Sequence, residues 1–341
     1  MDIHEMAIEF YNSEKYHLCK ELPDRTIDWR FEPFSIVYGK LNEDVDEIEI
    51  HLHLSSKENK RIFEGYQKVP VEKSAFAAKF SLEQKLSELP EQATIIVECD
   101  AMVKTITQKL ECARLSGRVE DFSGNALKGA IILLGKRRGW TEEFDGGMAI
   151  TDDNGHYDFY LPKGLYRQNW AITEDILTST LENYFYELTL EKDTVLNFRI
   201  DQAEIAKLAV TPVDDNHMFA LRFVCWTINT SCLPSYEALK RGETSDLSNF
   251  SDPRFMPHLK QDEVEVQANG IPVQIIAFEP VPVQCKTGEL TPGWYIEAVL
   301  PSAIGRGQHV LTVVVHHRSQ DPDGNEMIEH GQAQYFSLMF P

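Results

Sequence analysis

The residues of this 341-residue chain that could take part in chemistry fall into small groups, none of which is a complete catalytic set. One group is Arg137, Arg138 and Trp140, in the stretch RRGWTEEFDGG, with Trp170 further along the chain. A planar cation beside an indole can stack on a sugar ring or anchor a protein partner. The alternative is a tryptophan folded beneath its own loop, because large aromatic side chains usually become buried.

A second group consists of metal-type ligands around a predicted hairpin close to the C-terminus. His316 and His330 flank this hairpin, and Asp321 and Asp323 lie at its tip. Histidines on facing strands can meet and bind zinc, whereas a cluster of oxygen ligands suits calcium. The pattern lacks the third ligand that zinc requires, and aspartate is common at hairpin tips. A polar hairpin explains these residues, so we expect no metal and no other cofactor.

The other histidines and the cysteines lack metal-binding spacing. His51 and His53 share the outward face of one predicted strand, where solvent exposure explains them without ligation. The six cysteines are scattered and form no CxxC pair, which favours free thiols in a reducing cytoplasm. Residues 1–22 carry no basic segment followed by an apolar one, so no signal peptide is predicted. We therefore expect a cytoplasmic protein, with export still open if the sequence is that of a mature form.

Sequence signatures of the common enzyme classes are missing from the printed sequence. It contains no GxSxG elbow, no P-loop and no glycine-rich dinucleotide motif after a strand. Single serine, histidine and aspartate residues occur, but a sequence alone cannot pair them. These observations favour a protein without catalytic activity of its own and keep an enzyme as the alternative.

Composition narrows the class of partner. The chain has 33 Lys and Arg residues against 54 Asp and Glu residues, which gives a formal net charge of −21. Such a surface repels polyanions, so we expect no nucleic-acid partner and no anionic membrane surface. No apolar run approaches the roughly 20 residues that a membrane helix needs. A protein or a carbohydrate remains as the expected partner.

Short strands must position all of these residues. In DEIEIHLHLSS the apolar residues alternate with polar ones, which is the period of a half-buried strand. Similar strands recur at a spacing of about ten residues, and this rhythm favours β-sandwiches. The length of the chain predicts roughly two or three domains. We therefore predict an all-β chain of three consecutive β-sandwiches.

The predicted boundaries follow changes in composition. We place an N-terminal arm at 1–32, a first sandwich at 33–113, a second at 114–202 and a third at 203–341, with a long polar insertion at 233–261. The arm is predicted to hold a short helix over Ile3–Tyr11 and otherwise to lie extended against a later domain. Because the linkers are so short, we expect the sandwiches to pack as a semi-rigid rod.

The second predicted sandwich carries the most specific pattern. The segment GRVEDFSGNALKGAIILL is followed by TDDNGHYDFYLPKGLY, in which Gly124 and Gly155 sit in turns between short strands. Over about residues 114–200 this pattern resembles the carboxypeptidase regulatory-like domain, a transthyretin-like β-sandwich. The resemblance implies a module that supports other domains and is not itself catalytic. RRGWTEEFDGG departs from the family as an insertion, and the rhythm of 33–112 resembles bacterial immunoglobulin-like modules.

Together these features predict a non-catalytic scaffold or binding module for a carbohydrate or a protein partner. The alternative is a β-rich enzyme, or an accessory subunit of a carbohydrate-active enzyme complex, with a site near the 233–261 insertion and the C-terminal hairpin. A cell-surface adhesion module is a third interpretation, and it requires an export signal.

Overall fold

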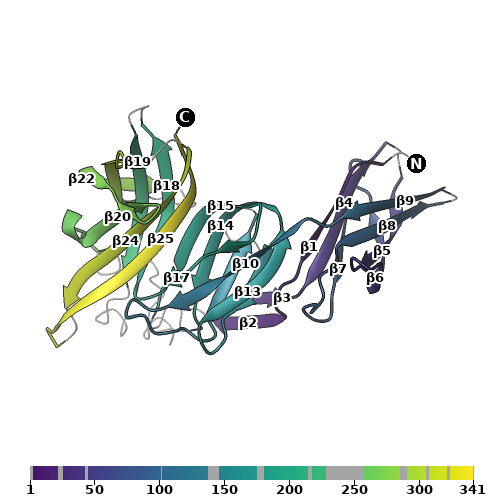
Figure 1. Ribbon diagram of the computed structural model, residues 1–341, viewed down its shortest axis with the longest axis horizontal. Coiled ribbons are helices and arrows are strands. Elements are labelled where there is room, and N and C mark those ends of the chain that lie inside the picture. The colour runs from purple at the N-terminus through teal and green to yellow at the C-terminus, as the bar shows by residue number, and fades with distance from the viewer. Residues whose placement is uncertain are drawn as a thin grey trace.

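The computed structural model describes residues 3–21, 26–42, 45–100, 102–136, 146–174, 180–213, 217–227, 257–284, 290–304, 307–320 and 323–340. Within these ranges the regular elements are strands, apart from one turn of 3₁₀ helix, η3, at Gln261–Glu263. No helix in these ranges is long and apolar enough to cross a membrane. Three β-sandwiches follow one another along the longest axis of the molecule (Figure 1), which confirms the predicted all-β architecture.

The first sandwich packs a three-stranded sheet, β1-β4-β7, on a four-stranded sheet, β6-β5-β8-β9. Its strands are β1 (Ile3–Tyr11), β4 (Phe34–Leu41), β5 (Glu47–Ser55), β6 (Arg61–Pro70), β7 (Ala75–Ser81), β8 (Gln92–Cys99) and β9 (Met102–Lys109). The alternation predicted for β5 is confirmed, because Ile48, Ile50, Leu52 and Leu54 are all at most 1% exposed.

The predicted helix over Ile3–Tyr11 is wrong, because these residues form strand β1. The strand pairs antiparallel with β4 from Ile3 opposite Leu41 to Tyr11 opposite Phe34. Its register shifts between His4 and Ala7, and Glu5 within this bulge has a φ of 49°. A bulge adds one residue to a strand, so side chains on either side of it lose the period of two. This broken alternation hides the strand in the sequence.

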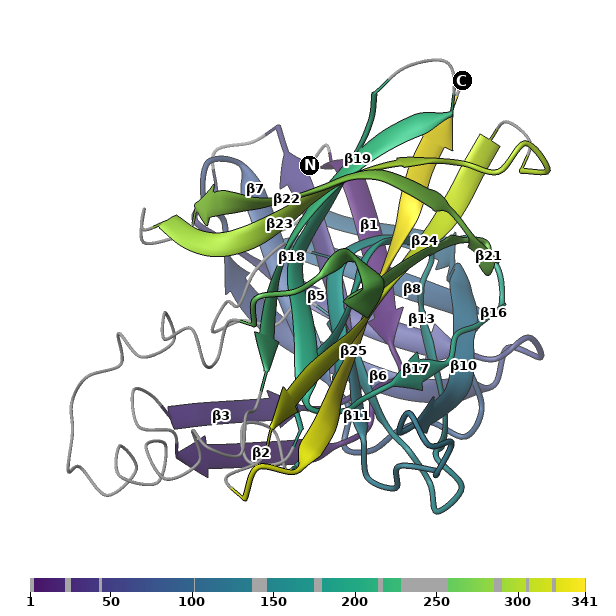
Figure 2. The same cartoon turned by 90° about the vertical axis from the view of Figure 1, so that its left-hand side faces the viewer.

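Two N-terminal strands reach later parts of the chain, where the sequence predicted an extended arm. They form a hairpin of β2 (Tyr16–Glu21) and β3 (Thr26–Phe31). Phe31 is buried in a core that it shares with the second and third sandwiches, and the Tyr16 hydroxyl donates to Glu174 at 2.8 Å. Figure 2, with the third sandwich towards the viewer, shows this hairpin along one lower side of the molecule.

The second sandwich places β13-β10 with two short strands, β16 and β17, against the four strands β12-β11-β14-β15. Its strands are β10 (Cys112–Glu120), β11 (Ile131–Gly135), β12 (Gly146–Ile150), β13 (His156–Pro162), β14 (Gly164–Ile172), β15 (Asn183–Leu190), β16 (Thr194–Val195) and β17 (Phe198–Arg199). The predicted hairpin turn before β13 is confirmed. The Asp152 carboxylate accepts the N–H groups of Asn154 and His156, and Gly155 has a φ of 74°.

The third sandwich combines the sheet β18-β19-β23-β22 with the strands β25-β24-β20-β21. Its strands are β18 (Ala203–Pro212), β19 (Met218–Thr227), β20 (Val264–Ala268), β21 (Ile271–Pro272), β22 (Gln274–Gln284), β23 (Leu290–Val299), β24 (Gly307–Gln320) and β25 (Glu326–Phe340). The predicted turn at Asn269 and Gly270 is confirmed, since both have a positive φ. Most of the insertion predicted at 233–261, namely 233–256, lies outside the described residues.

Candidate functional site

The structure excludes Trp170 from the predicted exposed binding group and does not describe the other three members. Arg137, Arg138 and Trp140 lie outside the described residues. Trp170 lies on β14, is 2% exposed and packs 6.2 Å from the ring of Tyr184. Its ring offers no open face to a sugar or to a protein, which corrects the expectation that Trp170 joins an exposed site.

His316 and His330 meet, as the hairpin pattern predicted. They are register partners on β24 and β25, and their Nδ1 atoms lie 2.7 Å apart, so one imidazole donates a hydrogen bond to the other. Phe122, from a turn of the second sandwich, stacks on His330 with a centroid distance of 4.8 Å. The guanidinium of Arg199 lies 5.7 Å from the centre of the Phe122 ring. The histidine pair therefore joins the third sandwich to the second.

The environment of this pair favours neutral imidazoles. Burial lowers the pKa of His316, against the pull of Glu265, whose Oε2 atom lies 3.9 Å from Nε2. Burial and then the charge of His316 lower the pKa of His330. Asp321 lies outside the described residues, and Asp323 is exposed. The prediction that these four residues bind no metal stays a prediction, and the two Nδ1 atoms already bond to each other.

A buried carboxyl group lies on the same strand as His330, on the opposite face of the sheet. Glu329, next to His330 on β25, is fully buried, and its Oε2 atom accepts a hydrogen bond from the Ser319 hydroxyl at 3.0 Å. Burial, reinforced by the charge of Asp201, raises the pKa of Glu329 to about 7. Burial also raises the pKa of Asp201 to about 6. The joint between the second and third sandwiches thus contains carboxyl groups that resist ionisation.

The main connection at this joint is a shared sheet. Strands β15 and β25 pair in parallel, with Tyr184 opposite Ala333 and Tyr186 opposite Tyr335. This pairing joins the strands of both sandwiches into one eight-stranded sheet, β12-β11-β14-β15-β25-β24-β20-β21. A hydrogen-bonded ladder fixes neighbouring strands about 4.8 Å apart, so the two sandwiches cannot turn freely about each other.

Both faces of the shared sheet are buried where the two sandwiches meet. Along β11, Ile132 and Leu134 belong to the core of the second sandwich, whereas Ile131 and Leu133 belong to the core shared with the third. All five residues of β11 are buried. Separating the sandwiches would expose one complete apolar face of the sheet, and apolar burial is the main favourable term in such contacts.

Asn12 connects the first sandwich to the second. Its side-chain amide donates to the carbonyl of Leu86 at 2.9 Å and accepts the N–H of Leu86 at 2.8 Å. Its main-chain N–H donates to the carbonyl of Tyr160, on β13, at 3.1 Å. Asn12 is 1% exposed, so these bonds are shielded from water. One side chain thus holds the β7–β8 loop of the first sandwich while its backbone binds a strand of the second.

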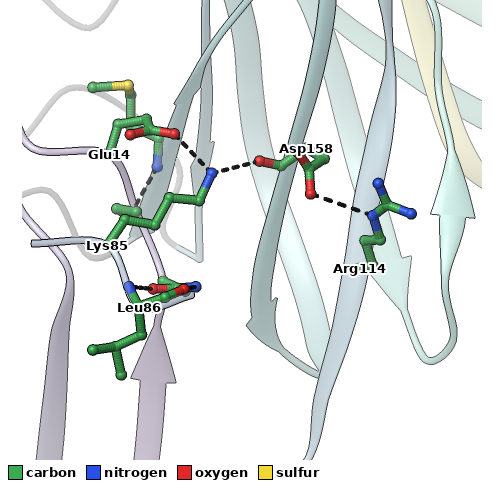
Figure 3. Close-up of polar contacts among 8 residues, drawn as sticks. Glu14, Lys85, Leu86, Arg114 and Asp158 are labelled. Carbon is green, nitrogen blue, oxygen red and sulfur yellow. Dashed lines mark hydrogen bonds and ion pairs between the residues drawn. The ribbon is translucent and has the colours of Figure 1, made fainter. Parts of the chain in front are cut away.

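A chain of charged groups runs past Leu86, from Glu14 to Arg114, as Figure 3 shows. Lys85 forms an ion pair with Glu14 at 2.7 Å and donates to the carbonyl of Asp158 at 2.9 Å. The carboxylate of Asp158 lies 3.4 Å from Nε of Arg114. Half-exposed ion pairs contribute little energy individually, so their main effect here is to fix orientation.

Apolar side chains also cross this first joint. Tyr11 and Phe34, from the ends of β1 and β4, stack with a centroid distance of 4.5 Å and belong to the core of the second sandwich. The linker is very short, since Leu110 lies in the core of the first sandwich and Ala113 in that of the second. Sequence reading missed Asn12 and Lys85, because a single asparagine or lysine after a strand is typical of an ordinary loop.

Comparisons with known proteins add little. No family model matches this sequence, and no curated protein matches it. Among solved structures, the chain is similar to a protein proposed to bind carbohydrate from Bacteroides uniformis, at 9% identity and a TM-score of 0.23 over 66% of this chain and 99% of that one. It is also similar to a DUF3823 family protein from Parabacteroides merdae, at 12% identity and a TM-score of 0.20 over 67% of this chain and 100% of that one. A third similar structure is the major pilin subunit of Bacillus cereus, at 12% identity and a TM-score of 0.20 over 67% of this chain and 70% of that one.

Proposed function

We propose that this chain is a non-catalytic scaffold that holds a bound partner in a fixed position. The observation that carries the proposal is the eight-stranded sheet shared by the second and third sandwiches. Two independent binding modules would not need a common sheet that is buried on both faces. The polar and aromatic contacts at Asn12 and Tyr11 support the same conclusion for the first joint.

The proposed partner is a carbohydrate or a protein. The formal net charge of −21 disfavours polyanions as partners. The likeness of residues 114–200 to the carboxypeptidase regulatory-like domain supports a module that carries other domains, and this assignment is part of the proposal. The Arg137, Arg138 and Trp140 group remains the predicted contact for such a partner, and a cytoplasmic location remains the predicted compartment.

Small-angle X-ray scattering of the full chain tests the scaffold proposal. A stiff row of three sandwiches predicts a scattering curve that one conformation fits, with the elongated shape seen in Figure 1. A control variant carries a short Gly/Ser insertion after Glu111, in the linker between the first two sandwiches, and should need an ensemble of conformations. If the unmodified chain also needs a broad ensemble, the proposal fails. Turnover of a sugar or a peptide by the purified chain would contradict its non-catalytic part.

A further inference from the structure

The outer face of the first sandwich carries a cluster of ligand-type side chains that the scaffold function does not use. Strand β5 turns its apolar residues inwards, so Glu49 and His51 share the outer face two positions apart. Glu98, on the neighbouring strand β8, is the register partner of Glu49. Main-chain pairing therefore brings two carboxylates and one imidazole together on one surface.

The distances suit a shared metal ion. One ligand atom from each of Glu49, His51 and Glu98 lies within 4.8 Å of the others, and no other such group of three occurs in the described part of the chain. Nε2 of His51 lies 3.9 Å from Oε1 of Glu98, too far for a hydrogen bond. Tetrahedral zinc at its normal bond lengths holds its ligand atoms roughly 3.3 Å apart. Small side-chain rotations close that difference.

The charges of this face also favour a cation. Glu49 and Glu98 are directly opposite each other, and like charges in that position destabilise a sheet. Lys68 lies opposite Glu49 in the register but forms its ion pair with Glu47, at 2.5 Å. A divalent cation between the two carboxylates would remove the repulsion that the strand register imposes on them.

Tyr66 restrains two of the three side chains. Its ring lies 4.7 Å from the ring of His51, and burial together with a hydrogen bond to Glu49 raises the pKa of its hydroxyl. Contacts of this kind around metal ligands fix their orientation and strengthen binding. His53, on the same face, has a single carboxylate nearby, with Oε1 of Glu64 at 3.7 Å. The geometry thus separates His51 from its otherwise similar neighbour.

The cluster is accessible from outside. Glu49 and Glu98 also line a neighbouring hollow, whose walls include Lys68, Glu47 and Asp100 but not His51. Figure 1 shows the β8–β9 hairpin at the end of the molecule farthest from the third sandwich. A metal ion held by three exposed side chains keeps at least one coordination position for a water molecule or another ligand.

We propose that Glu49, His51 and Glu98 form a surface site for one divalent transition-metal ion of the zinc class. The imidazole ligand favours zinc over calcium or magnesium. Calcium also needs six to eight oxygen ligands, which three side chains of this kind do not supply. The proposal is independent of the scaffold function, and it goes beyond the expectation that exposure explains His51.

Isothermal titration of the metal-free full chain with ZnCl₂ tests this site. The expected result is one zinc ion per chain at this site, with an affinity that drops by more than about tenfold in His51→Gln and in Glu98→Gln. His53→Gln is the matched control, and His330→Gln tests the histidine pair of the third sandwich; both should keep the site. CoCl₂ should give visible d–d absorption in the wild type that disappears in His51→Gln, and millimolar CaCl₂ should not displace the zinc.

The outcomes separate clearly. Wild-type protein that binds no zinc overturns the proposal, and so does equal binding by the His51→Gln and wild-type chains. Equal loss in His51→Gln and His53→Gln indicates unspecific binding by surface histidines and also overturns it. Thermal melts of the metal-free variants show whether each is folded, and the two separate ligand variants keep the test decisive if one of them does not fold.

Discussion

At the scale of single residues, a polar side chain at a joint can take the place of main-chain hydrogen-bond partners. Asn12 uses its side-chain amide to bond both main-chain groups of Leu86, as a neighbouring strand would. Glu329 shows the opposite situation, since its carboxyl group is buried where a charge is disfavoured. Asn12 leads to a prediction about the free energy of unfolding, and Glu329 leads to one about how that free energy depends on pH.

Replacing Asn12 by alanine should weaken the joint between the first two sandwiches. The variant leaves the main-chain groups of Leu86 without their partner, which costs about 1–2 kcal/mol in the free energy of unfolding. Urea unfolding followed by circular dichroism measures this loss. Gln92→Ala, at an exposed position of β8, is the control and should stay within about 0.5 kcal/mol of the wild type. An Asn12→Ala chain as stable as the control would contradict the assigned role.

Glu329 should make the stability of the chain depend on pH. Its pKa is raised from 4.5 to about 7 in the folded protein, so folding favours the protonated form. The folded state binds more protons than the unfolded state between these values, so the contribution of this group to stability falls as the pH rises through that window. Once the Glu329 carboxyl group is ionised, above about pH 7, the free energy of unfolding is lower by on the order of 3 kcal/mol.

Glu329→Gln is the variant that isolates this effect, because an amide stays neutral at every pH. The variant should match the wild type at pH 4.5 and be more stable at pH 8, as measured by urea unfolding. Glu326→Gln, at the exposed start of β25, should show no such pH-dependent difference. A constant difference between Glu329→Gln and wild type at both pH values would refute the buried-charge explanation.

At the scale of elements, the strands of the shared sheet are packed on both sides. Gly331, on β25, lies where this strand crosses the beginning of β18. A Cβ atom at this position would lie 2.6 Å from the carbonyl oxygen of Ala203, which is closer than real contacts allow. The absence of a side chain is therefore what allows the two sheets of the third sandwich to pack at this crossing.

Gly331→Val should loosen the packing between the two sheets of the third sandwich. The added side chain must displace the backbone of β18, and overpacking of this kind costs about 1–3 kcal/mol. Differential scanning calorimetry should show a transition at lower temperature or one that splits in two. Ile328→Val, a conservative change at an exposed position of the same strand, should leave the transition unchanged. If Gly331→Val melts like this control, the crossing does not constrain the packing of the two sheets.

Some elements could be predicted from the sequence because their signal is local. The alternation of apolar and polar residues in β5 and the hydrogen bonds of the Asp152 carboxylate within its turn depend on neighbouring residues alone. The bulge at Glu5 removes that alternation from β1. The pairing of Tyr184 with Ala333 joins residues far apart in the chain, and no local pattern encodes it. For the candidate site, the contact of His316 with His330 followed from the hairpin, whereas Glu98 could join His51 only once the register was known.

At the scale of the whole molecule, the three sandwiches form one row whose joints differ in construction. The first joint combines a short linker with Asn12, the Lys85 contacts and two stacked aromatic rings. The second joint is a continuous sheet buried on both faces. A scaffold that positions a partner requires both joints to be stiff, which is the central claim of the proposed function.

Distance measurements between spin labels across each joint test that claim most directly. Labels at Val195→Cys and Val103→Cys span the first joint, and labels at Val195→Cys and Ile276→Cys span the second; all three positions are exposed. Cys19 is exposed and would also react with the label, so it is replaced by serine. Cys232 and Cys285 are replaced by serine as well. Stiff joints predict a single narrow distance distribution for each pair, and the Gly/Ser insertion after Glu111 should broaden only the first. Broad distributions in the unmodified chain would contradict the account.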